Sequence, residues 1–291
     1  MSDSFHNRQY WESRLGEHFS LAGVGYLRLG RRYNEWLYKA RIPVFDRVTA
    51  RLPVDWATAK VLDIGSGTGF YIDRWKARGV RDITGLDLTQ VVVDRLGEQH
   101  PGARFLRADI GLPLEGVELQ PASFDVISAF DIFFHIVDDA QFAQAFRNVA
   151  RLLKPGGYFL WSDNFVRQAT IRVAHQASRP LAESEAAVRA AGLEVVERVP
   201  MFVIMNYPTD TRGRWPKWLW TAMVAPAMVA EPLGWLLGAL LYPVEWVLNR
   251  VVRESPSVEM MVCRKAGSGK VEAAGSEREA GGRRSRPDVV A

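Results

Sequence analysis

The sequence has 291 residues, of which 48% are hydrophobic, enough for one large domain or one domain with a cap. Its single cysteine, Cys263, excludes an internal disulfide, and its five scattered histidines lack metal-ligand spacing, so no metal site is predicted. The net charge of +4 arises before residue 61, where ten Lys and Arg face six Asp and Glu. Such a modest excess predicts no nucleic-acid partner. It fits an anionic ligand, an anionic membrane face or a solvated helix surface.

Residues 1–58 are predicted to form an N-terminal helical lid. Apolar side chains recur there at helical spacing, at Tyr33, Trp36, Leu37 and Ala40. Pro43 is expected to open the next helix, and the glycine-containing stretch 21–26 is expected to be a loop. The first residues contain no apolar segment of the kind found in secretory signals, so a cytoplasmic protein is expected.

From Lys60 the pattern changes to strands that alternate with helices, which predicts a parallel sheet with helices on both faces. Helices are expected at 71–78, 89–96, 142–153 and 182–191, with a Lys-Pro-Gly-Gly turn at 154–157. Strands are expected at 61–64, 82–86, 104–107, 124–129, 158–162, 193–199 and 258–264. The main domain is therefore placed at 59–265, and the Gly-, Ser- and charge-rich segment 266–291 is expected to be a disordered tail.

A hydrophobic insertion, residues 201–257, interrupts this alternation before the last strand. Its apolar runs, 218–230 and 233–244, are predicted to be helical, but each is too short to span a bilayer. Three interpretations stay open: a cap over an apolar acceptor, helices lying in a membrane interface through 215–252, and a hairpin that packs on the sheet or on a second copy.

The strongest chemical signal is the segment Asp63-Ile-Gly-Ser-Gly-Thr-Gly69. A predicted strand leads into it and a predicted helix follows, so its glycines allow a tight turn and close approach of a ligand to the backbone. The spacing differs from the G-x-G-x-x-G of dinucleotide sites. An acid before the glycines suits a ligand with a positive amino group better than a pyrophosphate.

With Asp87, Asp109 and the Lys-Pro-Gly-Gly turn at sensible spacing, the chain resembles the class I S-adenosylmethionine-dependent methyltransferases. The resemblance implies a doubly wound, Rossmann-like α/β sandwich with a mostly parallel seven-stranded sheet whose last strand is antiparallel. It also implies that Asp63 holds the cofactor's amino group, Asp87 the ribose hydroxyls and Asp109 the adenine amino group. The cofactor-binding residues implied are Asp63, Gly65, Ser66, Gly67, Gly69, Asp87, Leu88, Asp109 and Ile110.

Two residues that follow the fourth predicted strand are candidates for catalysis, namely His135 and Asp131. Either could take a proton from the acceptor, while His135 could instead order its loop and Asp131 could cap a turn. The predicted function is methyl transfer to a hydroxyl or carbon of a small, hydrophobic or lipid-linked acceptor. The alternatives are a membrane-associated protein that binds S-adenosylmethionine without turnover, and a protein-modifying methyltransferase.

Overall fold

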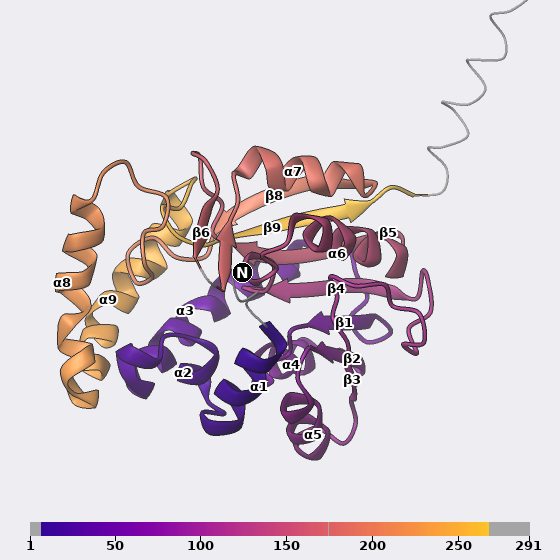
Figure 1. Cartoon of the computed structure of the whole chain (residues 1–291), viewed down its shortest axis with the longest axis horizontal. Helices are drawn as coiled ribbons and strands as arrows, with labels where there is room; N and C mark the ends of the chain where they lie inside the picture. Colours follow the sequence, from indigo (N-terminus) through magenta and orange to yellow (C-terminus); the bar gives the residue numbers. More distant parts are fainter. Residues whose placement is uncertain (1–6, 174, 268–291) are drawn as a thin grey trace, which may run out of the picture.

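The computed structural model describes residues 7–173 and 175–267. Their main sheet has seven strands in the order β3-β2-β1-β4-β5-β9-β8, with β9 antiparallel to both of its neighbours (Figure 1). The predicted fold class is thus confirmed, including the helical N-terminal segment and the helical insertion before the last strand. The disordered tail predicted from residue 266 falls almost wholly outside the described residues.

The strands of the main sheet lie close to their predicted places. They are β1 (Lys60–Ile64), β2 (Asp82–Asp87), β3 (Arg104–Arg107), β4 (Phe124–Phe130), β5 (Leu153–Asp163), β8 (Leu193–Pro200) and β9 (Glu259–Lys265). The main helices are α1 (Asn7–Glu17), α3 (Gly30–Arg51), α4 (Phe70–Ala77), α5 (Gln90–Gln99), α6 (Asp139–Leu152), α7 (Leu181–Ala190), α8 (Trp215–Val229) and α9 (Glu231–Val251). One-turn elements are α2 (Leu21–Val24), η1 (Leu27–Leu29) and η2 (Phe133–His135).

The central strands read as continuous apolar runs because helices cover both faces of the sheet. One core combines side chains of α3, α4, α8 and the sheet, and a second combines α6 and α7 with its opposite face. Cys263 of β9 is buried in the second core, and burial raises the pKa of its thiol to about 12. The thiol is therefore a packing group and not a nucleophile.

The prediction that Pro43 opens a helix is wrong, because Pro43 lies inside the single helix α3. A proline there removes the backbone hydrogen bond to residue 39. Tyr33 and Leu37 before it and Val48 after it are all buried in one core, so packing holds both halves in line. The stretch 21–26 also differs from the predicted loop: Ser20 accepts a hydrogen bond from Gly23 N–H and caps the short helix α2.

The predicted turn at 154–157 is instead an irregular part of β5, which begins at Leu153. Phe124 pairs with Leu153 and Val126 with Tyr158, so the four intervening residues bulge out of the ladder. A small two-stranded sheet of β6 (Ile171–Val173) and β7 (Gln176–Ser178) was not predicted. Strands of three residues are too short to show an alternating pattern.

The insertion forms a pair of helices, α8 and α9, joined through Ala230. Both lie at one end of the molecule, beside α3 (Figure 1). Gly238 of α9 sits against the indole of Trp36, where a Cβ atom would come within 2.3 Å of the ring. No helix within the described ranges is long and apolar enough to cross a membrane.

Candidate functional site

A cavity of about 1320 Å³ opens at the carboxyl ends of β1, β2 and β4. The chain order reverses between β1 and β4, and ligands of open α/β sheets bind at such a switch point. Single-ligand pockets commonly measure about 300–1,000 Å³, so this cavity has room for two ligands side by side.

The glycine segment forms one wall of the cavity. Gly65 has a φ of 71°, and a Cβ atom on it would lie 2.1 Å from Cδ1 of Ile132. Its N–H donates to the Leu86 carbonyl at 2.6 Å, which fixes the turn to the neighbouring strand. Only glycine tolerates both the positive φ and the close approach to Ile132. The backbone of Ser66 and Gly67 can therefore line the cavity directly.

Asp87 ends β2 and faces this turn. Its carboxylate accepts hydrogen bonds from Gly67 N–H at 3.1 Å, Thr89 N–H at 3.0 Å and the Thr89 hydroxyl at 2.8 Å. Burial raises the pKa of Asp87, and these hydrogen bonds oppose that shift. The carboxylate is thus held at a fixed place on the cavity wall, next to Leu88.

Asp109 and Ile110, beyond β3, line the same cavity. Asp109 Oδ1 accepts from Gly111 N–H at 2.8 Å, which orients the carboxylate, and the Ile110 side chain is buried beside it. Within the part of the chain that the structure describes, the buried Thr68 Oγ1 and Asn7 Oδ1 atoms lack a hydrogen-bond partner. Both residues line the cavity and could bond to a polar ligand there.

Two of the predicted cofactor residues, Asp63 and Gly69, lie behind the cavity wall and not on it. The Asp63 carboxylate accepts a 2.6 Å hydrogen bond from the Ser128 hydroxyl of β4, and burial raises its pKa to about 7. Gly69 is the N-cap of α4 with a φ of 83°, and a Cβ atom there would press on Leu96 of α5. Both residues thus support the turn from below.

A second part of the cavity lining, called the aromatic end below, contains an ion pair between Arg41 of α3 and the partly buried Asp131, with Arg41 Nη2 2.5 Å from Asp131 Oδ2. Asp131 has a φ of 59°, rare for a residue with a side chain, and such strain clusters at functional sites. The Ser162 hydroxyl donates to Asp131 Oδ1 at 2.7 Å and holds this conformation. Tyr38, Tyr71 and Phe130 complete this end of the cavity.

Arg41 was not among the site residues predicted from the sequence. A signal for it existed: Arg41 follows Leu37 by four residues and so shares the apolar face of α3. A cation on a face that turns toward the core needs a partner, and the strained Asp131 provides it.

His135 of η2 lies beside the same end of the cavity. Its Nδ1 donates to the His175 carbonyl at 2.9 Å, because a carbonyl can only accept, which leaves Nε2 as the basic nitrogen. The ring meets the Trp11 indole edge-on at 4.9 Å and stacks with the His175 ring at 6.0 Å. Burial lowers the pKa of His135 to about 4, so the imidazole is neutral and weakly basic near pH 7.

This lowered pKa predicts a pH-dependent stability. The unfolded state binds a proton near pH 6.5 and the folded state only near pH 4, so the contribution of His135 is complete above pH 6.5 and is lost as the pH falls toward 4. We expect at most about 3 kcal/mol, because each pKa unit corresponds to about 1.4 kcal/mol and the ring is only half-buried.

Denaturant unfolding between pH 4 and 7 would measure the effect in wild type and His135→Gln, whose curves should converge toward pH 4. His18→Gln, which replaces an exposed histidine just beyond α1, is the matched control for the loss of a histidine. Parallel curves for wild type and His135→Gln would contradict the prediction.

Helix α1 contributes Trp11 and Glu12 to the cavity and is fastened beside it at three points. Asn7 donates to the His135 carbonyl. Glu12 accepts from the backbone N–H groups of Gln90 and Val91 at the start of α5, at 2.8 and 2.9 Å. Arg14 donates to the Gly23 and Gly25 carbonyls, both at 2.6 Å. The helix thus joins η2 to α5 along the rim of the cavity.

The side chains that line the cavity offer acid–base groups and apolar surface. Among residues 7–173 and 175–267, no three His, Cys, Asp or Glu side chains are grouped so as to hold a metal ion.

The chain is similar in sequence to known methyltransferases. Residues 61–157 match a family described as a methyltransferase domain. A Mycolicibacterium smegmatis protein named "probable S-adenosylmethionine-dependent methyltransferase" is 31% identical over 176 residues, which are 58% of this chain and 63% of that protein. A ubiquinone biosynthesis O-methyltransferase of Idiomarina loihiensis is 33% identical over 105 residues, 35% of this chain and 41% of that protein. The chain thus spans less than two thirds of the length of these relatives.

Among solved structures, a Leishmania major S-adenosylmethionine-dependent methyltransferase aligns with a TM-score of 0.59. The alignment covers 89% of this chain and 81% of that one at 14% identity, and so concerns the fold.

Proposed function

Because this chain belongs to the class I S-adenosylmethionine-dependent methyltransferases, through residues 61–157, we propose that it transfers a methyl group from S-adenosylmethionine to a small, hydrophobic acceptor. The observation that carries the proposal is the single cavity that joins the glycine wall to an aromatic end. A fold alone does not decide function, whereas a cavity with room for donor and acceptor supports transfer between them.

The glycine wall fits the cofactor. The backbone at Ser66 and Gly67 approaches the cavity without side-chain obstruction, and the fixed Asp87 carboxylate can accept hydrogen bonds from two ribose hydroxyls. Asp109 and Ile110 would contact the adenine. Asp63 would affect binding of the amino group only indirectly, by supporting the turn that lines the cavity. When bound, the cofactor supplies a methyl group already activated on a sulfonium. The chain's own residues must align the acceptor and exclude water.

The aromatic end supports a hydrophobic acceptor. Trp11, Tyr38, Phe70, Tyr71 and Phe130 all line it, and aromatic side chains bind apolar surface at little entropic cost. Six residues of α1 line the cavity, and we propose that this helix encloses the bound ligands as a lid, which suits a small acceptor better than a protein chain.

The polar groups favour an acceptor oxygen that ionises easily. His135 is a weak base because its pKa lies near 4, and both oxygens of Asp131 already have partners. Neither is suited to remove a proton from an aliphatic alcohol. The neighbouring Arg41 cation would instead stabilise an oxyanion, so we infer that the acceptor is a phenol or a carboxylic acid. The O-methylation named for the Idiomarina relative supports oxygen over carbon.

The proposal predicts which acceptors are methylated. Purified full-length protein would be incubated with methyl-labelled S-adenosylmethionine and, separately, hydrophobic phenols, fatty acids and fatty alcohols. Labelled product, detected by mass spectrometry, should form with phenols or fatty acids and not with alcohols. Asp131→Asn should lower kcat by roughly a hundredfold with little change in cofactor affinity, because the Arg41 cation loses the carboxylate that positions it while the glycine wall is unchanged. Cofactor binding without any labelled product would instead support a protein that binds the cofactor without turnover.

A further inference from the structure

The outer face of the α8–α9 pair is apolar. Trp218 and Leu219 of α8 are 68% and 62% exposed, and Leu240 of α9 is 63% exposed. Trp215, Trp235 and Trp246 are also exposed on these helices. Isolated exposed apolar residues need no explanation, but so many on two adjacent helices indicate a surface that binds something.

This face carries almost no negative charge. From Ala222 to Asn249 the only charged residues are Glu231 and Glu245. Glu231 accepts from the backbone N–H groups of Arg31 and Arg32 and so caps helix α3. Glu245 is buried and accepts from three backbone N–H groups at residues 203–205. Both acids therefore already accept hydrogen bonds from backbone N–H groups, Glu245 in the interior and Glu231 at the surface.

Positive charge gathers at one end of the helix pair, where α8 begins and α9 ends. The segment 211–217, leading into α8, contains Arg212, Arg214 and Lys217, and the segment 250–253, at the end of α9, contains Arg250 and Arg253, with no acid in either. The guanidinium carbon of Arg250 lies 3.4 Å from the ring centre of Trp246. Tryptophan next to arginine is typical of the boundary between lipid headgroups and acyl chains.

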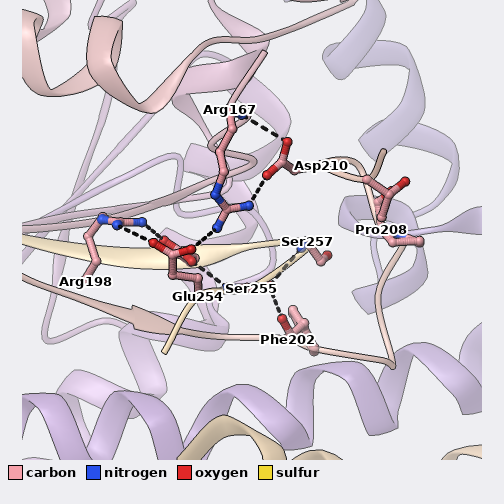
Figure 2. Close-up of polar contacts among 10 residues, drawn as sticks. Arg167, Arg198, Phe202, Pro208, Asp210, Glu254, Ser255 and Ser257 are labelled. Carbon is pink, nitrogen blue, oxygen red and sulfur yellow. Dashed lines mark hydrogen bonds and ion pairs between the residues drawn. The ribbon is translucent and has the colours of Figure 1, made fainter. Parts of the chain in front are cut away.

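The pair of helices is held firmly at its base. Figure 2 shows Arg167 between Asp210, which precedes α8, and Glu254, which follows α9. The Ser255 hydroxyl donates to the Phe202 carbonyl, and Ser257 N–H donates to the Ser255 hydroxyl at 2.8 Å. These contacts tie the start of the insertion to its end, so the apolar face keeps a fixed orientation.

From these observations we propose that the outer face of α8 and α9 docks the protein onto an anionic lipid surface. The helices lie in the interface, because neither is long and apolar enough to span it. The five cations at the end of the pair would be attracted to anionic lipid headgroups. The stacking of Arg250 on Trp246 and the five cations at this end suit anionic lipid headgroups, so a lipid surface is favoured over a second copy of the chain.

Docking would also serve the proposed methyl transfer, on which it does not depend. Helix α9 packs on α3, and α3 supplies Tyr38 and Arg41 to the cavity. Helices α9 and α3 therefore lie between the lipid surface and the aromatic end of the cavity, and docking would hold the cavity near a membrane that contains hydrophobic acceptors.

Vesicle flotation with the full-length protein tests the proposal. Wild type should bind vesicles of phosphatidylcholine with phosphatidylglycerol, and bind weakly to phosphatidylcholine alone or at high salt. The double variant Trp218→Ser and Leu240→Ser should bind at least about tenfold more weakly, because it lacks two apolar side chains that would enter the interface. Val173→Ser with Val196→Ser, which removes two apolar side chains that are 53% and 55% exposed elsewhere, is the matched control and should bind like wild type.

A charge variant separates the two contributions. Arg214→Glu with Arg250→Glu should lose binding to the anionic vesicles while the apolar face stays intact. Equal vesicle binding by wild type, the apolar double variant and the charge double variant would overturn the proposal. A wild-type dimer that the apolar double variant converts to a monomer, without vesicle binding, would assign the face to a second copy instead. Cofactor affinity should be the same in every variant, so a failure of docking remains distinct from a failure of the proposed methyl transfer.

Discussion

Asp87→Ala is expected to lower the affinity for S-adenosylmethionine by roughly 10²–10⁴-fold. The variant removes two charge-assisted hydrogen bonds to the ribose, worth about 1.5–3 kcal/mol each. It also removes the acceptor that orients Gly67 N–H and Thr89, so the glycine turn loses one of its fixed points. Isothermal titration calorimetry would measure the loss of affinity for the cofactor and for S-adenosylhomocysteine.

The matched control for this prediction is Asp82→Ala. Asp82 begins the same strand, is exposed, and forms only a surface ion pair with Lys60 at 3.3 Å. Surface ion pairs contribute about 0–1 kcal/mol, so this variant should bind the cofactor like wild type. An Asp87→Ala protein that folds and keeps wild-type affinity would refute the assignment of the cofactor site.

Gly65→Ala should abolish cofactor binding and reduce the free energy of unfolding by about 2–5 kcal/mol. A φ of 71° costs a residue with a Cβ atom about 1–2 kcal/mol, and the 2.1 Å approach to Ile132 adds about 1–3 kcal/mol of overpacking. Denaturant unfolding followed by circular dichroism would give the stability, and calorimetry would give the affinity.

Gly97→Ala provides the control for this glycine. Gly97 lies inside α5, is exposed, and a Cβ atom on it would meet nothing within 4 Å. Alanine favours a helix over glycine, so this variant should gain about 0.5–1 kcal/mol. If Gly65→Ala behaved like Gly97→Ala, the proposed conflict between Gly65 and Ile132 would be absent in solution.

The sheet could be predicted from the sequence because its signals are local. Short apolar strands end in acids and glycines at β1 and β2, and each is followed by a helix with a clear apolar face. The errors occur where distant contacts override local preference. Pro43 stays within a helix because both of its flanks are buried, and the segment 154–157 stays within a strand because its neighbours pair with β4.

The same distinction applies to the site. Asp87, Asp109 and the residues around Gly67 lie in a motif with ordered spacing and do line the cavity. Asp63 belongs to that motif, but its carboxylate faces Ser128 of a strand that comes more than 60 residues later, which spacing cannot show. The pairing of Arg41 with Asp131 and the fastening of α1 by Glu12 likewise join segments that are far apart in the chain.

The position of β9 has a consequence for how the chain folds. This last strand lies between β5 and β8, and Pro200 at the end of β8 pairs with Glu259 at its start, across the whole insertion. Closing so long a loop costs entropy before the pairing is gained, so we expect β9 to dock late. Until it docks, β8 has no hydrogen-bonded neighbour in the sheet, and two strand edges stay open to other chains. During synthesis the sheet can be completed only after residue 265 has left the ribosome, so a chaperone has its longest opportunity to act on this protein just before that point.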